Sequence, residues 1–218
     1  MKIINPITTE IIRKAKEGET IRSISQRTGF AYSAVYFWIN KLAKLDVFVL
    51  EKKGNKTIIR INSNEIYTYF KGLIEKIIEY EKDSSFWNLI KKTPLRARLG
   101  KETSAVIWVK GGYITNDFYN KIYYIDVTEK DYSILSKELK NREINFSKKT
   151  DNIASKPFII IKIIKKPQII RINGLPVASL SEVVSWCKKL KLEPILEQLN
   201  LIYKVPIKKK YSEVFTND

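Results

Sequence analysis

The order of helix-like and strand-like segments in the first 62 residues constrains this fold more than any other feature of the sequence. Hydrophobic residues recur at helical spacing after Pro6 and again over residues 21–28, where Thr20 is the expected N-cap. Gly29 then provides a break before a third helix over about residues 33–45. The spacing therefore predicts three short helices separated by tight turns.

The third helix has two unlike faces. At about 100° per residue, Val35, Ile39 and Leu42 fall on one side, which is the expected core side. The opposite side carries two aromatic rings and an amide among its polar groups: Ser33, Tyr36, Phe37, Asn40 and Lys44. Because a solvated helix face ordinarily carries charged and polar groups, this partly aromatic face is a candidate recognition surface.

Two β-prone runs follow the third helix, at residues 47–51 and 56–62, and a Lys-Lys-Gly-Asn segment joins them. Glycine and asparagine suit the backbone angles of a tight hairpin turn. The sequence therefore predicts helix, helix, glycine turn, helix and hairpin, in that order, over residues 1–62.

A resemblance to a known family covers residues 20–61, TIRSISQRTGFAYSAVYFWINKLAKLDVFVLEKKGNKTIIRI. This stretch is similar to the winged helix-turn-helix transcription regulators of the MarR-like and TrmB-like groups. The shared features are an Ile-x-x-Ile second helix, Gly29 in the turn, an S-x-V-x-x-x-I-x-x-L run in the third helix, and a basic wing centred on Gly54. The resemblance implies that the third helix enters the major groove of double-stranded DNA.

On this interpretation, the exposed side chains of the N-terminal domain divide into two sets. Asn40 is expected to contact adenine through two hydrogen bonds, and the aromatic rings to contact thymine methyl groups. The base-facing candidates are Tyr32, Ser33, Tyr36, Phe37 and Asn40. The phosphate-binding candidates, which would supply affinity rather than sequence preference, are Arg27, Lys41, Lys44, Lys52, Lys53 and Lys56.

A connecting helix is expected over residues 63–82, with a coiled-coil-like seam formed by Ile66, Phe70, Leu73 and Ile77. Two alternatives remain open for this seam: it joins two protomers of a homodimer, or it packs against its own domain. Residues 83–103 are expected to form a basic linker, which either follows a phosphate backbone or is a solvated connector. Its cations are Lys91, Lys92, Arg96, Arg98 and Lys101.

The remaining residues, 104–218, are expected to form a mixed α/β domain. A segment of it at residues 173–179, NGLPVAS, resembles part of the C-terminal domains of AbiE-type antitoxins, which are winged-helix repressors fused to an α/β domain. The expected elements are a hairpin from residues 105–109 and 113–115, a strand over 122–127, a helix over 128–141, a short strand over 143–146, a hairpin-like pair from 158–164 and 168–172, helices over 181–190 and 193–203, and a basic tail. The expected fold class of the chain is α+β: an N-terminal winged helix-turn-helix, a long connecting helix and a C-terminal mixed α/β domain.

Composition excludes several kinds of chemistry. The chain has 40 Lys and Arg residues against 23 Asp and Glu residues, a net charge of +17, which favours a polyanionic partner. It has no histidine, so imidazole catalysis and histidine metal sites are excluded, and its single cysteine, Cys187, excludes an internal disulfide. The carboxylates Asp117, Asp126, Glu129 and Asp131 are expected to be structural. We expect no metal, no cofactor and no enzyme activity.

The function that the sequence favours is sequence-specific binding of double-stranded DNA by a transcription regulator. The C-terminal domain would then bind a protein partner, mediate oligomerisation or sense an effector. Alternatives are an antitoxin-like autorepressor, a protein-interaction module that uses Tyr36 and Phe37 as an apolar docking patch, and a nucleic-acid-processing enzyme. The lack of a long uninterrupted apolar segment favours a cytoplasmic protein without a membrane partner.

Overall fold

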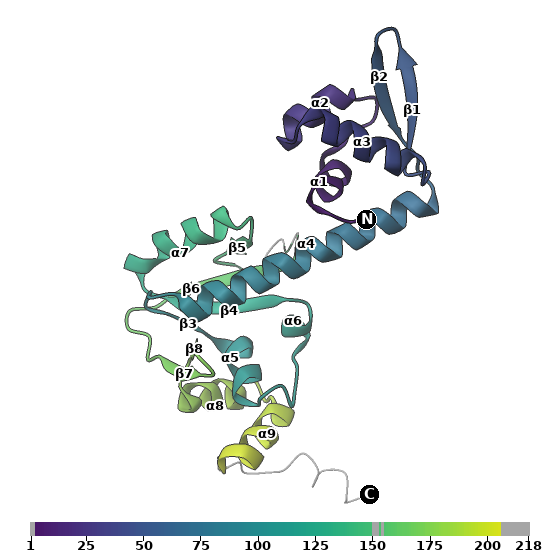
Figure 1. The fold of residues 1–218 in the computed structure, drawn as a ribbon. Helices are drawn as coiled ribbons and strands as arrows, with labels where there is room; N and C mark the ends of the chain where they lie inside the picture. The colour runs from purple at the N-terminus through teal and green to yellow at the C-terminus, as the bar shows by residue number, and fades with distance from the viewer. Residues whose placement is uncertain (1–2, 150–152, 154, 206–218) are drawn as a thin grey trace, which may run out of the picture. The chain divides into compact units, whose positions relative to one another are not determined.

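The computed structural model describes residues 3–149, 153 and 155–205, and the chain is α+β (Figure 1). It divides into two compact units, Met1–Ile78 (unit 1) and Glu79–Asp218 (unit 2). The division falls inside the long helix α4 (Glu65–Lys92), whereas the sequence predicted boundaries near residues 62, 82 and 103. The basic tail predicted after residue 205 lies outside the described residues.

Three helices open unit 1, and local capping groups fix where they begin and end. The side chain of Asn5 accepts hydrogen bonds from two backbone N–H groups at the start of α1 (Pro6–Lys14). Thr20 caps α2 (Ile21–Thr28) as the sequence predicts, with its Oγ1 3.1 Å from the backbone nitrogen of Ser23. Gly29 ends α2 with φ of 76°, a left-handed conformation that glycine adopts without steric cost.

A two-stranded antiparallel sheet follows α3 (Tyr32–Ala43). Its strands are β1 (Phe48–Lys53) and β2 (Lys56–Ile61), with Phe48 opposite Ile61 at the base and Lys53 opposite Lys56 at the tip. Gly54 takes a φ of 58° in the turn, so the predicted hairpin is confirmed. A backbone bridge between Thr20 and Ile58 ties the start of α2 to β2.

The core of unit 1 is built from one face of each helix. Ile24, Ile39 and Leu42 are fully buried, and Ile74 from α4 is 2% exposed in the same cluster. Burial of a large aliphatic side chain is worth about 1.5–3 kcal/mol, so this cluster holds the helices together. The other buried hydrophobic members are Ile11, Ile12, Ile21, Val35, Trp38, Val47, Phe48 and Ile59.

The length of helix α4 shows that the predicted linker is wrong. The sequence placed its end near residue 82 and a linker over residues 83–103, but the helix continues unbroken to Lys92. Phe86 and Ile90, four residues apart, are buried in the core of unit 2 and stabilise this extension. Strand β3 (Ala97–Leu99) and helix α5 (Lys101–Trp108) then occupy the rest of the predicted linker.

Within the described residues, unit 2 contains a six-stranded sheet in the order β5-β6-β4-β3-β8-β7. Strands β4 and β5 pair with β6 in parallel, and β3 pairs with β4 antiparallel. The C-terminal half of α4 and helix α7 pack on one face of the sheet, and α5 and α8 lie on the other (Figure 1). The bounds are β4 (Ile122–Val127), β5 (Asn145–Ser147), β6 (Phe158–Ile163), β7 (Ile170–Ile172), β8 (Leu175–Val177), α6 (Asn116–Tyr119), α7 (Glu129–Asn141), α8 (Leu180–Lys189) and α9 (Glu193–Tyr203).

Two of the predicted hairpins in unit 2 are wrong. Residues 105–109 were expected to be a strand, but they lie in and just after α5, because Ala105 and Val109 pack as helical neighbours against α8 and α9. Strands β6 and β7 do not pair with each other. Instead β7 pairs with β8 through the turn at Asn173 and Gly174, whose φ values of 50° and 81° suit a two-residue hairpin loop.

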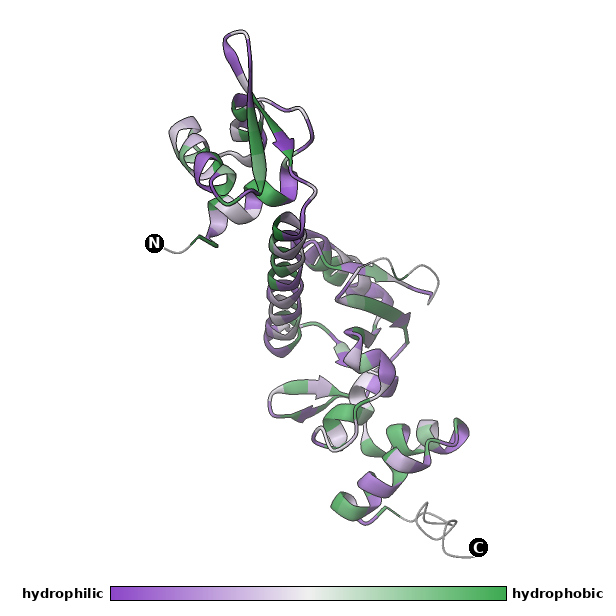
Figure 2. Cartoon of the chain, turned by 90° about the vertical axis from the view of Figure 1, so that its right-hand side faces the viewer, coloured by the Kyte–Doolittle hydropathy of each residue, from purple (hydrophilic) through white to green (hydrophobic). Residues whose placement is uncertain are grey.

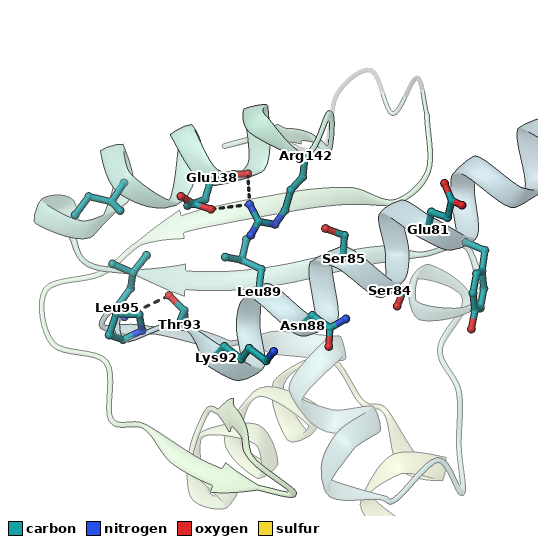
Figure 3. Close-up of a pocket in the computed structure, with 13 residues that line it drawn as sticks. Glu81, Ser84, Ser85, Asn88, Leu89, Lys92, Thr93, Leu95, Glu138 and Arg142 are labelled. Carbon is teal, nitrogen blue, oxygen red and sulfur yellow. Dashed lines mark hydrogen bonds and ion pairs between the residues drawn. The ribbon is translucent and has the colours of Figure 1, made fainter. Parts of the chain in front are cut away.

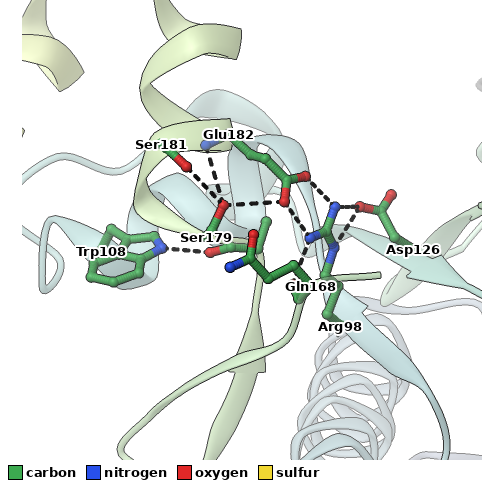
Figure 4. Close-up of polar contacts among 8 residues, drawn as sticks. Arg98, Trp108, Asp126, Gln168, Ser179, Ser181 and Glu182 are labelled. Atoms are coloured by element: carbon green, nitrogen blue, oxygen red, sulfur yellow. Dashed lines mark hydrogen bonds and ion pairs between the residues drawn. The ribbon is translucent and has the colours of Figure 1, made fainter. Parts of the chain in front are cut away.

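A buried cation links the parts of unit 2 (Figure 4). The guanidinium of Arg98 on β3 is 5% exposed and donates from Nε to Asp126 Oδ2 of β4 at 3.1 Å. It also donates to Glu182 Oε1 of α8 at 2.8 Å and to the backbone oxygen of Gln168 at 2.6 Å. Burial raises the pKa of Asp126 despite this partner, whereas the hydrogen bond from Arg98 lowers the pKa of Glu182. Arg98 therefore fits neither alternative that the sequence left open, a contact with a phosphate backbone or a residue of a solvated connector.

Replacing Arg98 should destabilise the protein strongly. We expect Arg98→Ala to lower the free energy of unfolding by about 3–5 kcal/mol, because Asp126 would remain buried without its cation. Arg96→Ala, which removes an exposed arginine two residues earlier, should change it by less than about 0.5 kcal/mol. Urea denaturation followed by circular dichroism measures both values, and equal effects of the two substitutions would contradict the role assigned to Arg98.

Candidate nucleic-acid interface

The exposed face of α3 is rich in aromatic rings. Tyr32, Tyr36 and Phe37 are 50%, 46% and 44% exposed, whereas Val35 and Ile39 on the other side are fully buried. The two-faced helix predicted from the spacing is thus present. Ser33 is also exposed at the start of the same face.

The rings on this face are ordered by contacts with one another and with a lysine. Tyr32 and Tyr36 are stacked, with ring centroids 6.0 Å apart. Lys41 Nζ lies 5.6 Å from the ring centroid of Phe37, within the range of a cation–π interaction. These contacts present flat apolar surfaces and a positive charge on one side of α3.

Asn40 is held by its own helix but keeps hydrogen-bonding capacity. Its Nδ2 donates to the backbone oxygen of Tyr36 at 2.7 Å. An amide nitrogen carries two hydrogens and the amide oxygen accepts. One N–H and the oxygen therefore remain for a two-point contact, and the bond to Tyr36 restricts the orientation of the amide.

A groove of about 890 Å³ lies between α2, the start of α3 and the tip of the β1–β2 hairpin. Two of its residues, Arg22 and Gln26, are exposed on α2 and were missed by the sequence analysis. Their spacing of four residues, on the side of α2 opposite Ile21 and Ile24, was the available signal. The lining residues are Thr20, Ile21, Arg22, Ser23, Ser25, Gln26, Tyr32, Asn55, Lys56 and Thr57.

The hairpin is hydrophilic near its tip (Figure 2). Lys52, Lys53 and Lys56 are exposed, and no carboxylate within the described residues pairs with them. Nearer the base, Arg60 forms an ion pair with Glu51, and this pair leaves only the tip lysines uncompensated. Clustered cations without partners attract an anionic ligand.

Two other predicted phosphate contacts differ in their surroundings. Arg27 forms an ion pair with Glu19, and its Nη1 donates to the backbone oxygen of Lys14. These bonds connect the ends of α1 and α2, so Arg27 has a structural role that the sequence did not indicate. Lys44, at the C-terminal end of α3, is exposed.

The predicted seam on α4 does not form a single stripe. Ile66 and Leu73 are 41% and 50% exposed, but Phe70 packs against the core of unit 1, and Ile77 is half-buried. The reason is that the core already uses the side of α4 that carries Ile74. The exposed apolar residues are instead Ile66, Tyr69 and Leu73, at helical spacings of three and four.

The cations of the predicted linker lie on different elements. Lys91 and Lys92 end α4, Arg96 precedes β3, and Lys101 begins α5, with its Nζ 4.7 Å from the ring centroid of Tyr124. They do not form one basic segment.

Two of the carboxylates that the sequence predicts to be structural accept side-chain hydrogen bonds within unit 2. Asp117 accepts a hydrogen bond from the hydroxyl of Tyr124 at 2.6 Å, and Asp131 accepts from Thr128 at 2.7 Å. Among the residues that the structure covers, no group of three His, Cys, Asp or Glu side chains could hold a metal ion. Burial raises the pKa of the Cys187 thiol to about 12, so this cysteine is a poor nucleophile.

Three further findings are negative. Comparison with models of protein families found no match, and a search of curated proteins found none either. In the described ranges, no helix is both long and apolar enough to span a bilayer.

Introducing a carboxylate at two neighbouring positions of α4 should have different effects on the free energy of unfolding. At concentrations where the chain is monomeric, we expect Leu73→Asp to change the free energy of unfolding by less than about 0.5 kcal/mol, because Leu73 is half exposed in one copy of the chain. Ile74→Asp should unfold unit 1, since it buries a carboxylate without a partner. Urea denaturation provides the measurement, and destabilisation of equal size by both variants would contradict the exposed position of Leu73.

Proposed function

We propose that this protein is a transcription regulator that binds double-stranded DNA sequence-specifically through a winged helix-turn-helix in unit 1. The observation that carries the proposal is the groove that α2, the start of α3 and the hairpin tip share. In this interpretation α3 is the recognition helix and the β1–β2 hairpin is the wing. A helix, a tight turn, a second helix and an adjacent basic hairpin are the parts such a domain requires.

The exposed face of α3 would read the major groove. The groove of B-DNA is about 12 Å wide and accepts one α-helix, of about 10–12 Å diameter including its side chains. Asn40 would pair with adenine through its free N–H and its oxygen. Tyr36 and Phe37, nearly half exposed, would contact thymine methyl groups.

Phosphate contacts would come from both sides of the groove. Lys52, Lys53 and Lys56 on the hairpin and Arg22 on α2 are exposed cations that could neutralise backbone phosphates. Such contacts contribute affinity and position the recognition helix, while base contacts contribute preference.

Homodimerisation is part of the proposal. Ile66, Tyr69 and Leu73 are exposed along one side of α4 and would pack against a second copy of the chain. A two-fold dimer would then bind two half-sites related by symmetry. Unit 2 would bind a protein partner or sense an effector.

A second candidate function is a protein-interaction module, including an antitoxin-like repressor that docks a toxin. The observation that favours it is the exposure of Tyr32, Tyr36 and Phe37 on a single helix face. Aromatic anchors of this kind dominate the binding free energy of protein interfaces. The two functions differ in which residues of α3 carry the binding.

The wing lysines should determine the salt dependence of DNA binding. We expect the triple variant K52A/K53A/K56A to bind specific and random duplexes more weakly and to lower the slope of log K against log salt by about one unit per lost contact. Lys130, Lys137 and Lys140, exposed on α7, provide a matched triple variant that should retain the slope. Fluorescence anisotropy over a salt series measures it, and an unchanged slope in the wing variant would remove the hairpin from the interface.

The recognition helix should determine sequence preference. Selection from a random duplex pool defines the preferred site. Asn40→Ala should then cost about 1–3 kcal/mol on that site and change binding to random duplex little, because the lost contact is to a base. Tyr36→Ala and Phe37→Ala should cost less on the same site.

The control is Asn141→Ala, which removes an exposed amide from the end of α7 and should leave both affinities unchanged. Equal losses on specific and random DNA for the three α3 variants would refute readout by this helix. A docking module predicts a third pattern, with strong losses of partner binding in the aromatic variants and little effect of Asn40→Ala.

A further inference from the structure

Cations from distant parts of the sequence meet at one end of the sheet of unit 2, where β4 and β6 end and β3 begins. The backbone N–H of Thr128, just after β4, donates to the backbone oxygen of Arg96 at 3.3 Å. The backbone N–H of Ile164, just after β6, donates to the backbone oxygen of Val127 at 2.9 Å. Arg96 and Lys165, the residue after Ile164, therefore lie on either side of the end of β4, with their backbones roughly 10 Å apart at two strand spacings.

Two further cations converge on the turn between β7 and β8. Arg171 Nη1 donates to the backbone oxygen of Gly174 at 2.8 Å. The stem of Lys91, from the last turn of α4, lies against the same glycine, where a Cβ would come within 3.0 Å of Lys91 Cε. Two like charges brought to one turn repel each other, and a bound anion removes that cost.

Six exposed cations make up this part of unit 2, and across the residues that the structure describes no ion pair engages any of them. Figure 3 shows Lys92 on the side of α4 away from the ion pair of Arg142 with Glu138. We call the six cations the unit 2 basic surface: Lys91, Lys92, Arg96, Lys165, Lys166 and Arg171.

Two carboxylates lie at the same end of the sheet, at the start of α7, and they leave an excess of positive charge there. They are Glu129 and Asp131. Asp131 Oδ2 already accepts from the hydroxyl of Thr128 at 2.7 Å and from the backbone N–H of Arg96 at 3.2 Å. The unit 2 basic surface is therefore open to an external anion.

Buried contacts fix the segments that carry these cations. Arg98 donates to the backbone oxygen of Gln168 at 2.6 Å, which holds the loop after β6 against the sheet (Figure 4). Ile90, buried in the core of unit 2, fixes the last turn of α4. The cations thus stand on ordered backbone, so binding of a partner loses little backbone entropy.

The kind of anion follows from the residue types around the cations. Residues 91–96 and 164–174, which carry all six, contain no aromatic residue. Proteins that bind single-stranded nucleic acid combine cations with aromatic rings on which the bases stack. A duplex keeps its bases stacked inside and presents one phosphate charge per about 1.7 Å of its axis. Cations without rings therefore suit the backbone of a duplex.

We propose that the unit 2 basic surface binds the phosphate backbone of double-stranded DNA without reading its sequence. Each cation that neutralises a phosphate releases a condensed counterion, so the contact adds affinity to specific and random duplexes alike. Phosphates of one strand are about 3.4 Å apart along the axis, so the distance between Arg96 and Lys165 covers about three of them. This contact is separate from the interface proposed for unit 1 and does not depend on base readout by α3.

The test compares two quadruple variants of the full chain that lower the net charge equally. K91Q/K165Q/K166Q/R171Q changes the unit 2 basic surface. K137Q/K140Q/K189Q/K191Q is the matched control, because it removes four exposed lysines from α7 and the end of α8. On a random-sequence DNA duplex, we expect the first variant to lower the slope of log K against log salt by about 0.9 unit for each lost contact. The control should retain the slope, and fluorescence anisotropy over a salt series measures both.

A double variant guards against misfolding of the quadruple one. K165Q/K166Q changes only two exposed lysines of one loop, and it should lower the slope by about half as much. Circular dichroism of each variant verifies that unit 2 remains folded.

Three outcomes would overturn the assignment. The first is an unchanged slope in both the quadruple and the double variant. The second is an equal decrease in the quadruple variant and its control, which would indicate diffuse attraction by net charge. The third is tighter binding of an RNA duplex of the same length, weakened by the same four substitutions, which would make RNA the partner.

The wing variant K52A/K53A/K56A separates this surface from the function proposed for unit 1. A lower slope in the wing variant alone refutes the unit 2 contact and leaves the proposed function intact. A lower slope in the unit 2 variant alone supports the contact described here and removes the hairpin from the interface. Because the substitutions lie in different units, decreases from both should add in the combined variant.

Discussion

Helix α4 contributes buried side chains to two separate hydrophobic cores along one continuous helix. Its first half buries Ile74 among the residues of unit 1, and its second half buries Phe86 and Ile90 in unit 2. The stretch between them carries half-buried residues, such as Ile78 on the core of unit 1, as well as exposed ones such as Ser84. The proposed interface in unit 1 depends on this helix, because α4 completes the core on which α2, α3 and the hairpin rest.

The elements of unit 1 could be predicted because their signals are local. Thr20, Gly29 and the glycine of the hairpin each act within a few residues, and the observed bounds differ from the expected ones by one or two positions. The exposed face of α3 was predictable for the same reason, since a helix of regular pitch fixes which side chains share a side. Arg22 and Gln26 were missed because their role depends on where the hairpin lies, which no local pattern gives.

Unit 2 was harder to predict because its signals are distant in sequence. In the sequence, Arg98 resembles an exposed linker arginine. Its partners Asp126 and Glu182 follow it by tens of residues, so no local pattern indicates that it is paired. The chain after α4 also alternates short helices and short strands, and short apolar runs do not distinguish the two. Ala105 lies in α5 and Val109 directly follows it, and both pack against α8 and α9, which are distant in sequence. The capped helix α7 and helix α9, by contrast, lie where the sequence predicts them.

A helix shared by two cores also limits how the chain can change in evolution. A surface loop tolerates inserted or deleted residues, because a change in its length need not rotate the elements that it connects. Each residue added to a helix turns everything beyond it by about 100° and advances it by 1.5 Å. An insertion between Ile74 and Phe86 would therefore change the angular offset between the two buried faces.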